Sequence, residues 1–386
     1  MGILSGMKIL DFSTLLPGPY ATMMFADMGA DVLKVESSTR PDLLSGMQAT
    51  HHHLNRSKSS ITLNLKKEES VEIVKKLVLD YDIVIEQFRP GVMKRLGLDY
   101  ESMKQVNPRL IYCSLTGFGQ TGPYQNRPGH DNNYLALSGM LDYSRRRGEK
   151  PTTMGIQIAD IAGGSMNAVI GILAAALHRE KTGEGQYIDI SMTDASFALN
   201  AMFGPDYLVN GVEPQPEELL LNGGTFYDYY ETKDGRCFSV GSLEPQFRML
   251  LCVALQKPDL IRFAMSEKPA DQHRFKEEIK ASFLEKDFDE WLEVFDEGFE
   301  GCVEPVLTFA EACEHPQLRA RGMITEVPRP DGEGQKQIAT PLKFSSAKPV
   351  YTHVGPRLGE HTEEVLMAQG YTKEQILEFR NNGVLS

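Results

Sequence analysis

The stretch from Met7 to Glu36, MKILDFSTLLPGPYATMMFADMGADVLKVE, decides the fold of this chain. Its two ends, Met7–Phe12 and Asp31–Glu36, are short runs that resemble buried strands. Between them, Pro17-Gly-Pro-Tyr20 opens a helical segment that ends at Gly29. A strand, a helix and a second strand in this order predict the beginning of a parallel α/β sheet.

The same alternation continues along the first half of the chain. The sequence predicts helices at Lys67–Leu79 and Thr193–Leu208, and further strands at Asp82–Gln87, Arg109–Leu115 and Gln186–Ser191. The run DIAGGSMNAVIGILAAALHRE, which begins at Asp160, is small and apolar on nearly all sides. It therefore predicts a helix buried between layers of the fold.

The composition changes after residue 210, which predicts a second domain. Gly211–Gly224 carries prolines, two adjacent glycines and an acidic pair, as linkers often do. Two strand-like runs in Phe226–Val240 flank Lys233-Asp-Gly-Arg236, which is a hairpin signal. The pattern is then mostly helical from Glu244 to Ala320, turn-rich at Arg329–Gln337, and helical again at Glu360–Leu377.

Length and charge restrict the class of protein. A chain of 386 residues is long enough for two or three domains with sizeable cores. Its formal net charge of −13 repels phosphate backbones, which argues against a nucleic-acid partner.

The number and spacing of the cysteines and the length of the apolar stretches indicate in which cellular compartment the protein is expected. The five cysteines are odd in number and form no CxxC pair, so neither a disulfide framework nor a zinc cluster is indicated. The chain shows no basic-then-apolar leader, and its longest apolar stretch, Ala168–Leu177, is well short of the roughly 20 residues of a membrane span. We expect a cytoplasmic protein without a membrane partner.

Two familiar motifs are excluded by their context. Gly117–Gly122 matches GxGxxG, but Pro123 and Pro128 follow where a dinucleotide-binding fold needs a helix. His51-His-His53 has no acidic partner nearby, and adjacent histidines do not converge on one ion. The sequence therefore predicts neither a nicotinamide or flavin site nor a metal site.

Asp160 and His130 are the two side chains that most resemble acid–base groups. Asp160 lies at the expected start of the apolar helix, where the helix dipole favours a carboxylate and suits it to act as a base or nucleophile. His130 lies in a loop before an apolar segment, where an imidazole can exchange a proton near pH 7. Each also has a structural explanation, Asp160 as a helix N-cap and His130 as a hydrogen-bonded loop residue.

Basic residues cluster in the first half of the chain. These clusters are Asn55-Arg-Ser-Lys58, Lys66-Lys67, Arg89, Lys94-Arg95 and Arg145–Arg147. On a negatively charged chain they suit a phosphorylated ligand, although ordinary solvated side chains explain the same pattern.

A series of short motifs runs in order along nearly the whole chain. They are Leu16-Pro-Gly-Pro19, Gly29-Ala-Asp-Val32, NRSK at Asn55 with LNLK at Leu63, FRPGVM at Phe88, LTGFGQ at Leu115, GHDNNYLALSG at Gly129, DIAGG at Asp160, Gly223-Gly224, GSLEPQF at Gly241 and LGEHTE at Leu358. Together they resemble the family III CoA-transferase group, also called CaiB/BaiF, and within it the alpha-methylacyl-CoA racemases.

The resemblance implies a fold and an assembly. We expect a large Rossmann-like domain with a parallel sheet, formed by residues 1–210 and completed by residues 335–386. Residues 211–334 would form a smaller α+β domain with its linkers. The resemblance also implies an interlocked homodimer that binds an acyl-CoA in the large domain and needs no prosthetic group.

The resemblance also implies the site residues. The catalytic set would be His130, Asp160 and Glu244, with Glu244 orienting the imidazole. Coenzyme A would be bound by the residues at matched positions, which are Arg40, Leu63, Asn64, Leu65, Lys66, Gln87, Phe88, Arg89, Arg95, Asp131 and Tyr134. Arg40, in ESSTRP, stands for an arginine that the racemases carry in a DRP run.

Two activities are compatible with this resemblance. Racemases exchange the proton beside the thioester carbonyl between an aspartate and a histidine, whereas the transferases use the same aspartate as a nucleophile towards the thioester. His130 in GHDNNYLALSG, close to the racemase run GHDINYLALSG, and Glu244 in LEPQF favour the racemase of 2-methyl-branched acyl-CoA. The run Asn222-Gly-Gly-Thr225 in place of a GGGGQ loop also favours it. A CoA-transferase that works through Asp160 is the alternative.

Overall fold

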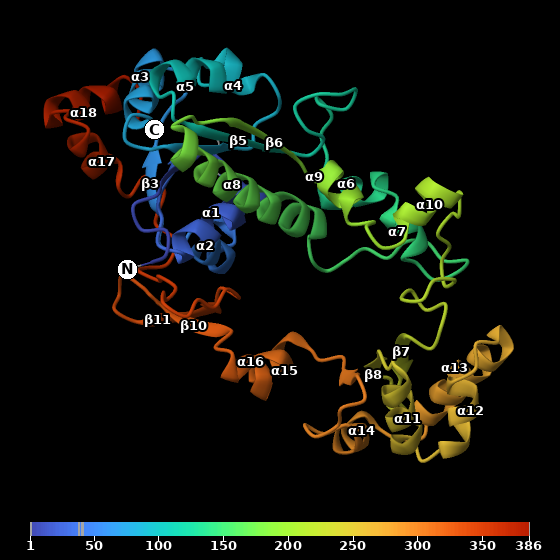
Figure 1. The fold of residues 1–386 in the computed structure, drawn as a ribbon. Helices are drawn as coiled ribbons and strands as arrows, with labels where there is room; N and C mark the ends of the chain where they lie inside the picture. Colours follow the sequence, from blue (N-terminus) through green and yellow to red (C-terminus); the bar gives the residue numbers. More distant parts are fainter. Residues whose placement is uncertain (1, 38, 40–41, 386) are drawn as a thin grey trace. The chain divides into compact units, whose positions relative to one another are not determined.

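The computed structural model describes residues 2–37, 39 and 42–385, and it divides the chain into two compact units (Figure 1). The first unit comprises residues 1–138, 154–199 and 316–386, and the second comprises residues 139–153 and 200–315. The first unit is therefore assembled from three separate stretches of the chain. Arg40 lies outside the described residues.

These boundaries differ from the expected ones at 210/211 and 334/335. Residues 139–153 join the second unit because Arg146 forms ion pairs there with Glu217 and Asp228. Residues 316–334 join the first unit, where the segment expected to be turn-rich forms the hairpin of β10 (Ile324–Pro328) and β11 (Gly334–Ile338).

A six-stranded parallel sheet forms the centre of the first unit; the sequence predicts a parallel sheet and five of its strands, but not the strand at Ser59–Thr62. Its order is β3-β2-β1-β4-β5-β6, so the strand order reverses between β1 and β4. The bounds are β1 (Lys8–Asp11), β2 (Asp31–Glu36), β3 (Ser59–Thr62), β4 (Ile83–Glu86), β5 (Ile111–Thr116) and β6 (Tyr187–Ser191). In sheets of this kind ligands bind at the carboxyl ends of the strands where the order reverses.

Helices cover both faces of this sheet (Figure 1). On one face lie α1 (Pro17–Asp27) and α8 (Met166–Thr182), which pack against each other. The apolar core of the other face is closed by α3 (Glu68–Leu77), α5 (Tyr100–Val106), α17 (Thr362–Ala368) and α18 (Lys373–Asn381). The layered architecture confirms the predicted α/β class.

The end of the chain completes the first unit beside β3. The Thr62 N–H donates to Thr362 Oγ1 at 3.1 Å, and the Asn64 N–H donates to the Val384 carbonyl at 2.8 Å. Leu385 lies in the same buried core as Leu63. The last residues of the chain are thus integral to the domain that its first residues begin.

The second unit has its own antiparallel sheet and aromatic core. Its sheet is β7 (Asp228–Glu231), β8 (Cys237–Val240) and β9 (Val303–Pro305), which confirms the predicted hairpin. The helices α11 (Pro245–Ala254), α13 (Pro269–Phe283) and α14 (Phe288–Val294) pack on it through rings such as Phe283 and Trp291. These features give an α+β unit, separate from the parallel sheet.

The remaining elements are short. They are η1 (Leu43–Gly46), α2 (Gln48–Leu54), α4 (Val92–Arg95), α6 (Asp131–Leu137), α7 (Met140–Tyr143), η2 (Ala159–Ser165), α9 (Met192–Ala198), α10 (Gly204–Asn210), η3 (Pro258–Leu260), α12 (Ile261–Ala264), α15 (Phe309–Glu314) and α16 (Pro316–Ala320). The single helix expected at Thr193–Leu208 is therefore two helices, α9 in the first unit and α10 in the second.

The apolar helix differs from its prediction in two ways. Its first seven residues form the π-helix η2, and only then does α8 begin. One face of α8 is also uncovered, with Ile170 63% and Leu177 61% exposed. Among the described residues, 159–182 is the one helix long and apolar enough to cross a membrane by length and composition, but buried core helices meet the same criterion and α8 packs on β5 and β6.

Candidate active site

Asp160 lies in the π-helix η2, one residue after its first residue. The structure corrects its expected role as an N-cap, because the N-cap position is occupied by Ile158. Gly163 and Gly164 allow α9 to approach closely: a Cβ on either would lie 3.3 Å or less from atoms of Met192. Wider π-turns are rare and concentrate at functional sites.

Asp131 joins the start of α6 to this π-helix. Its Oδ1 accepts the backbone N–H of Asp160 at 2.9 Å. The residue before it, His130, is the N-cap of α6, and the His130 N–H donates to Asn133 Oδ1 at 3.0 Å. The imidazole of His130 is exposed, while its backbone is fixed next to the residue that holds Asp160.

The surroundings raise the pKa of Asp160 from 3.8 to about 6. Burial is the main cause and the negative charge of Asp131 adds to it, whereas His130 is near enough to lower the pKa. The sequence-based expectation that the helix terminus favours the carboxylate is therefore wrong. Burial dominates the dipole, and the backbone N–H that would have stabilised the charge is already bonded to Asp131.

Tyr134 forms the buried side of this cluster. Its hydroxyl donates to the Gly129 carbonyl, immediately before His130. Burial, together with the charges of Asp160 and Asp131, raises the pKa of Tyr134 to about 12, so it stays a neutral phenol. The structure thus brings together four of the predicted site residues, which are His130, Asp131, Tyr134 and Asp160.

Glu244 belongs to the other unit. It is exposed and occupies the N-cap position of α11 in the second unit, whereas His130 and Asp160 belong to the first. Its side chain accepts no capping hydrogen bond at this helix end.

The residues expected to bind coenzyme A follow the carboxyl ends of two strands. Leu63–Lys66 come directly after β3, Gln87–Arg89 come directly after β4, and Arg95 ends α4. Lys66, Arg89 and Arg95 have exposed side chains.

Two of the expected contact residues face inward instead. Leu63 lies in the core of the first unit, and the Asn64 side chain donates to the Gly383 carbonyl at 3.1 Å. A ligand at this edge would therefore meet their backbone.

One predicted basic cluster is wrong as a ligand site. Arg56 and Lys58 are fully buried and serve the fold. The Arg56 guanidinium donates to both carboxylate oxygens of Asp27, at 2.7 and 2.6 Å, and to the Ile338 carbonyl at 2.7 Å. It thus holds the C-terminal hairpin to α1.

The adjacent histidine run serves the same hairpin region. His51 Nε2 lies 3.0 Å from the Pro356 carbonyl oxygen, and His52 Nδ1 lies 2.8 Å from Gln335 Oε1. Within the part of the chain that the structure describes, no group of three or more metal-ligating side chains is placed to hold an ion.

The glycine motif at 117–122 is a loop and not the start of a helix. No helix begins between β5 and α6, so a dinucleotide cannot meet a helix N-terminus there, as the prolines predict. The Gly117 carbonyl instead accepts hydrogen bonds from the backbone and side chain of Thr193 at the start of α9.

The fold agrees with comparisons to known proteins. A sequence profile of CoA-transferase family III matches residues 4–362. The chain belongs to this family. The resemblance that its motifs indicated is therefore correct.

Relatives in this family have two kinds of activity. The chain is 36% identical to an alpha-methylacyl-CoA racemase of Homo sapiens, over 99% of this chain and 97% of that protein. It is 33% identical to a succinate–glutarate CoA-transferase of Agrobacterium fabrum, over 94% of both chains. In structure it matches a CaiB/BaiF family protein of Brucella suis with a TM-score of 0.82 and 30% identity, over 96% of this chain and 100% of that one. Family III members are thus enzymes, both racemases and CoA-transferases.

Proposed function

We propose that this protein is an acyl-CoA racemase that interconverts 2-methyl-branched acyl-CoA stereoisomers. The observation that carries the proposal is the cluster in which Asp131 ties the helix that begins after His130 to the backbone of Asp160. This gives one imidazole and one carboxyl in electrostatic contact, on separate elements at the same site. Inverting a stereocentre by proton transfer needs two such groups.

The proposed reaction removes a proton on one face of the α-carbon and returns one on the other. A neutral His130 takes the proton, the C–H electron pair moves into the thioester, and its oxygen becomes an enolate oxygen. A protonated Asp160 then gives its proton to the opposite face. In the reverse direction the Asp160 carboxylate is the base and the His130 imidazolium is the acid. A pKa near 6 keeps both forms of Asp160 populated close to neutral pH.

Glu244 and the strand-end residues complete the proposal. Glu244 would accept a hydrogen bond from the second ring nitrogen of His130, which fixes the tautomer and raises its basicity. The acyl-CoA is the substrate, and no prosthetic group takes part. Its nucleotide would lie along Leu63–Lys66 and Gln87–Arg89, with Arg95 and Arg40 at its phosphates.

We place this activity in a homodimer with interlocked subunits. The uncovered face of α8 supports it, because Ile170 and Leu177 expose large apolar side chains. Leu208 and Val209 on α10 are also largely exposed. A second copy of the chain would cover these residues.

A family III CoA-transferase is the second candidate, since relatives of similar identity have that activity. In that reaction an ionised Asp160 oxygen attacks the thioester carbonyl carbon, and the CoA thiolate leaves with the electron pair of the broken C–S bond. The CoA thiolate then attacks the Asp160 carbonyl carbon of the mixed anhydride, which releases the donor acid as a carboxylate and leaves Asp160 as a CoA thioester. The acceptor carboxylate attacks that thioester and expels the thiolate, and the thiolate then attacks the acceptor's acyl carbon, which forms the new thioester and restores the Asp160 carboxylate. The raised pKa of Asp160 favours the proton-transfer role, because a carboxyl near its pKa both gives and takes protons.

One experiment separates the two candidates. The protein is incubated with a 2-methylacyl-CoA in deuterium oxide, and exchange at C2 is followed by mass spectrometry. In parallel, a free carboxylic acid is offered and new thioesters are sought. Exchange without transfer supports the racemase; transfer, with a hydroxylamine-sensitive adduct on Asp160, overturns it in favour of the CoA-transferase.

A further inference from the structure

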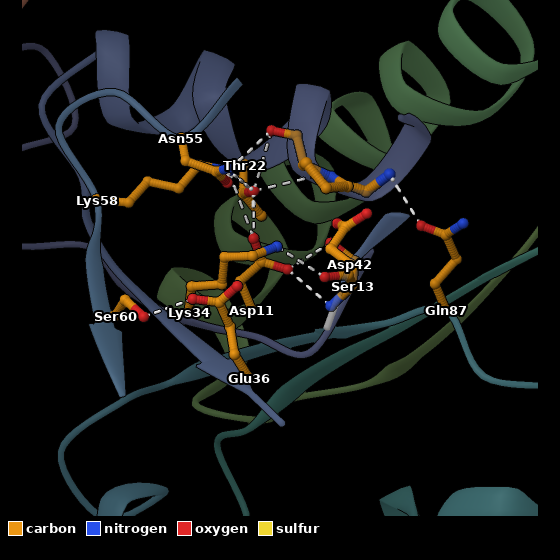
Figure 2. A network of polar contacts seen from close by, with 12 residues as sticks. Asp11, Ser13, Thr22, Lys34, Glu36, Asp42, Asn55, Lys58, Ser60 and Gln87 are labelled. Atoms are coloured by element: carbon orange, nitrogen blue, oxygen red, sulfur yellow. Dashed lines mark hydrogen bonds and ion pairs between the residues drawn. The ribbon is translucent and has the colours of Figure 1, made fainter. Parts of the chain in front are cut away.

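A network of buried charges lies beneath the first loop of the sheet (Figure 2). Asp11 at the end of β1, Lys34 in β2 and Lys58 before β3 are all almost completely buried. Lys58 Nζ lies 3.5 Å from Asp11 Oδ2. Lys58 and Lys34 thus both act electrostatically on one fully buried carboxylate in the core of the first unit, and burial lowers the pKa of Lys58 from 10.5 to about 7.

All three charged groups act on the loop between β1 and α1. Asp11 Oδ1 accepts the Ser13 N–H at 2.9 Å and also its hydroxyl. Lys34 Nζ donates to the Ser13 carbonyl at 2.9 Å, and Lys58 Nζ donates to the Pro19 carbonyl at 2.9 Å. The network thus fixes Ser13 at the start of the loop (Figure 2) and Pro19 in the first turn of α1.

Thr22 links the cation of Lys58 to the carboxylate. Its hydroxyl accepts from Lys58 Nζ at 2.8 Å and donates to Asp11 Oδ2 at 2.6 Å. The network is therefore continuous from β1 through α1 to the residue that precedes β3.

Two further side chains hold Leu15 in the loop and Gly18 in the first turn of α1. Asp42 Oδ2 accepts the Leu15 N–H at 2.9 Å, and Gln87 Oε1, from the end of β4, accepts the Gly18 N–H at 3.1 Å. Leu15 is held at a φ of 60°, a conformation that costs free energy for a residue other than glycine. Such strain persists only where the surrounding structure overdetermines it.

The loop is connected directly to the helix of Asp160. The Ser165 hydroxyl lies 2.7 Å from the Pro17 carbonyl oxygen and 3.0 Å from the Asp160 carbonyl oxygen, so one fully buried donor bridges both. The loop also lies where the strand order reverses, between the ends of β1 and β4. Through Ser165 this segment is thus linked to the backbone of the residue that bears the candidate catalytic carboxyl.

We propose that Lys58, Lys34 and Asp11 are positioning residues, which hold the loop Ser13–Gly18 as a rigid wall against the π-helix and so set the place of the Asp160 carboxyl. A charged core of this composition is a poor means of stabilisation, since apolar side chains of the same volume avoid the cost of desolvation. The charged core instead fixes the geometry of the backbone at Ser13 and Pro19, to which its side chains are hydrogen-bonded. The catalytic consequence of this inference rests on the proposed function.

The test compares two variants with a matched control in the full chain. Lys58→Met removes a buried cation of the network, and Ser165→Ala removes the bridge without changing any charge. The control is Arg179→Met, which also removes a buried cation from the first unit. Arg179 pairs with Asp82 at 2.6 Å from the far end of α8, the helix that follows the segment bearing Asp160.

The first measurement is the titration of the Asp160 carboxyl by 13C NMR, in protein labelled at the aspartate side-chain carboxyl and assigned with Asp160→Asn. A loosened wall admits water, so the titration of Asp160 moves down by about one pH unit in both variants and stays in place in the control. The other groups that face Asp160, which are His130, Asp131 and Tyr134, are unchanged in all three proteins. An Asp160 titration that is the same in all of them overturns the proposal.

The second measurement is the rate of C2 exchange or of CoA transfer, whichever the wild type catalyses. We expect kcat to fall about tenfold or more in both variants while the Kd for coenzyme A is unchanged, because a displaced carboxyl loses alignment and not binding. If Arg179→Met loses as much kcat as Lys58→Met and Ser165→Ala do, the network has only a structural role and the proposal is overturned. A wild type without either activity would overturn the proposed function alone, and the NMR comparison would still decide the positioning role.

Discussion

The carboxylate of Asp131 accepts the backbone N–H of Asp160 at 2.9 Å, so two acidic residues lie in direct contact at the centre of the candidate site. The contact does two things. It fixes the π-helix to the start of α6, and it places a negative charge that helps to raise the pKa of Asp160 to about 6. Both the position and the protonation state of Asp160 therefore depend on Asp131.

Replacing Asp131 tests this dependence. Asp131→Asn keeps an oxygen that accepts the Asp160 N–H but removes the charge, so the pKa of Asp160 falls below about 6. The acidic limb of the pH profile of kcat/KM should then move to lower pH. Asp131→Ala, which also loses the hydrogen bond, should in addition lower kcat. An unmoved acidic limb in Asp131→Asn would show that Asp160 is not the group that titrates.

His130 tests the proton-transfer role. In His130→Ala we expect C2 exchange to fall by about 10²- to 10⁴-fold, the usual contribution of one acid–base group. His178→Ala removes an exposed histidine of α8 and should retain full activity. Deuterium incorporation measured by mass spectrometry distinguishes the two. A His130→Ala enzyme that retains most of its acyl-transfer activity would favour Asp160 as a nucleophile.

Replacing Arg56 tests whether this side chain holds the β10–β11 hairpin to α1. Arg56→Met leaves Asp27 buried and unpaired, which should lower the free energy of unfolding by about 3–5 kcal/mol. Arg357→Met, at an exposed ion pair with Glu360, should change it by less than about 1 kcal/mol. Urea denaturation followed by circular dichroism gives both values. Equal effects would contradict the structural role assigned to Arg56.

Glu86 makes the stability depend on pH. Burial raises the pKa of its carboxyl from 4.5 to about 7, and Asp189 adds to the rise, while hydrogen bonds from Ser114 and the Phe88 N–H lower it. Between about pH 4.5 and 7 the Glu86 carboxyl is protonated in the folded protein but ionised in the unfolded chain. Its contribution to the free energy of unfolding therefore falls as the pH rises through that range.

Glu86→Gln removes this titration and keeps an oxygen for the Phe88 N–H. The variant should be more stable than the wild type at pH 8 and differ little from it at pH 5. Denaturation curves at the two pH values check this. A variant that is less stable than the wild type at pH 8 would mean that Glu86 is held as a carboxylate.

Ile170 tests the proposed homodimer. Ile170→Asp places a charge on the uncovered face of α8 and should convert a dimer into monomers, as measured by light scattering after gel filtration. Leu79→Asp changes a similarly exposed apolar residue that follows α3 and should leave the mass unchanged. A wild type that is already monomeric would contradict the proposed assembly.

Five strands of the parallel sheet could be predicted because their signal is local, whereas the short polar strand β3 was missed. Runs such as Ile83–Glu86 are buried along their whole length in a parallel sheet, so they are mostly apolar and stand out between turns. The hairpin around Lys233–Arg236 is equally local, because a short turn fixes its register. Patterns within ten residues were enough for both.

What the sequence did not indicate depends on contacts between distant segments. Arg56 and Lys58 look like surface residues in NRSK, and they are buried only because Asp27 and Asp11 lie opposite them. The π-turn at Asp160 likewise follows from the packing of glycines against α9, which no local pattern reports. Charged residues inside two predicted strands, Asp11 in Met7–Phe12 and Lys34 in Asp31–Glu36, were the local signs of the buried network.

The discontinuity of the first unit has a consequence during synthesis. On the ribosome, the strands from the first half of the chain emerge long before Thr362, Val384 and Leu385, which close the core beside β3. The inserted stretch 200–315 emerges in between, so it can fold while its host is still open. The parallel sheet therefore gains its full apolar cover only after Leu385 has emerged, and a nascent chain stalled short of that point exposes β3 to aggregation.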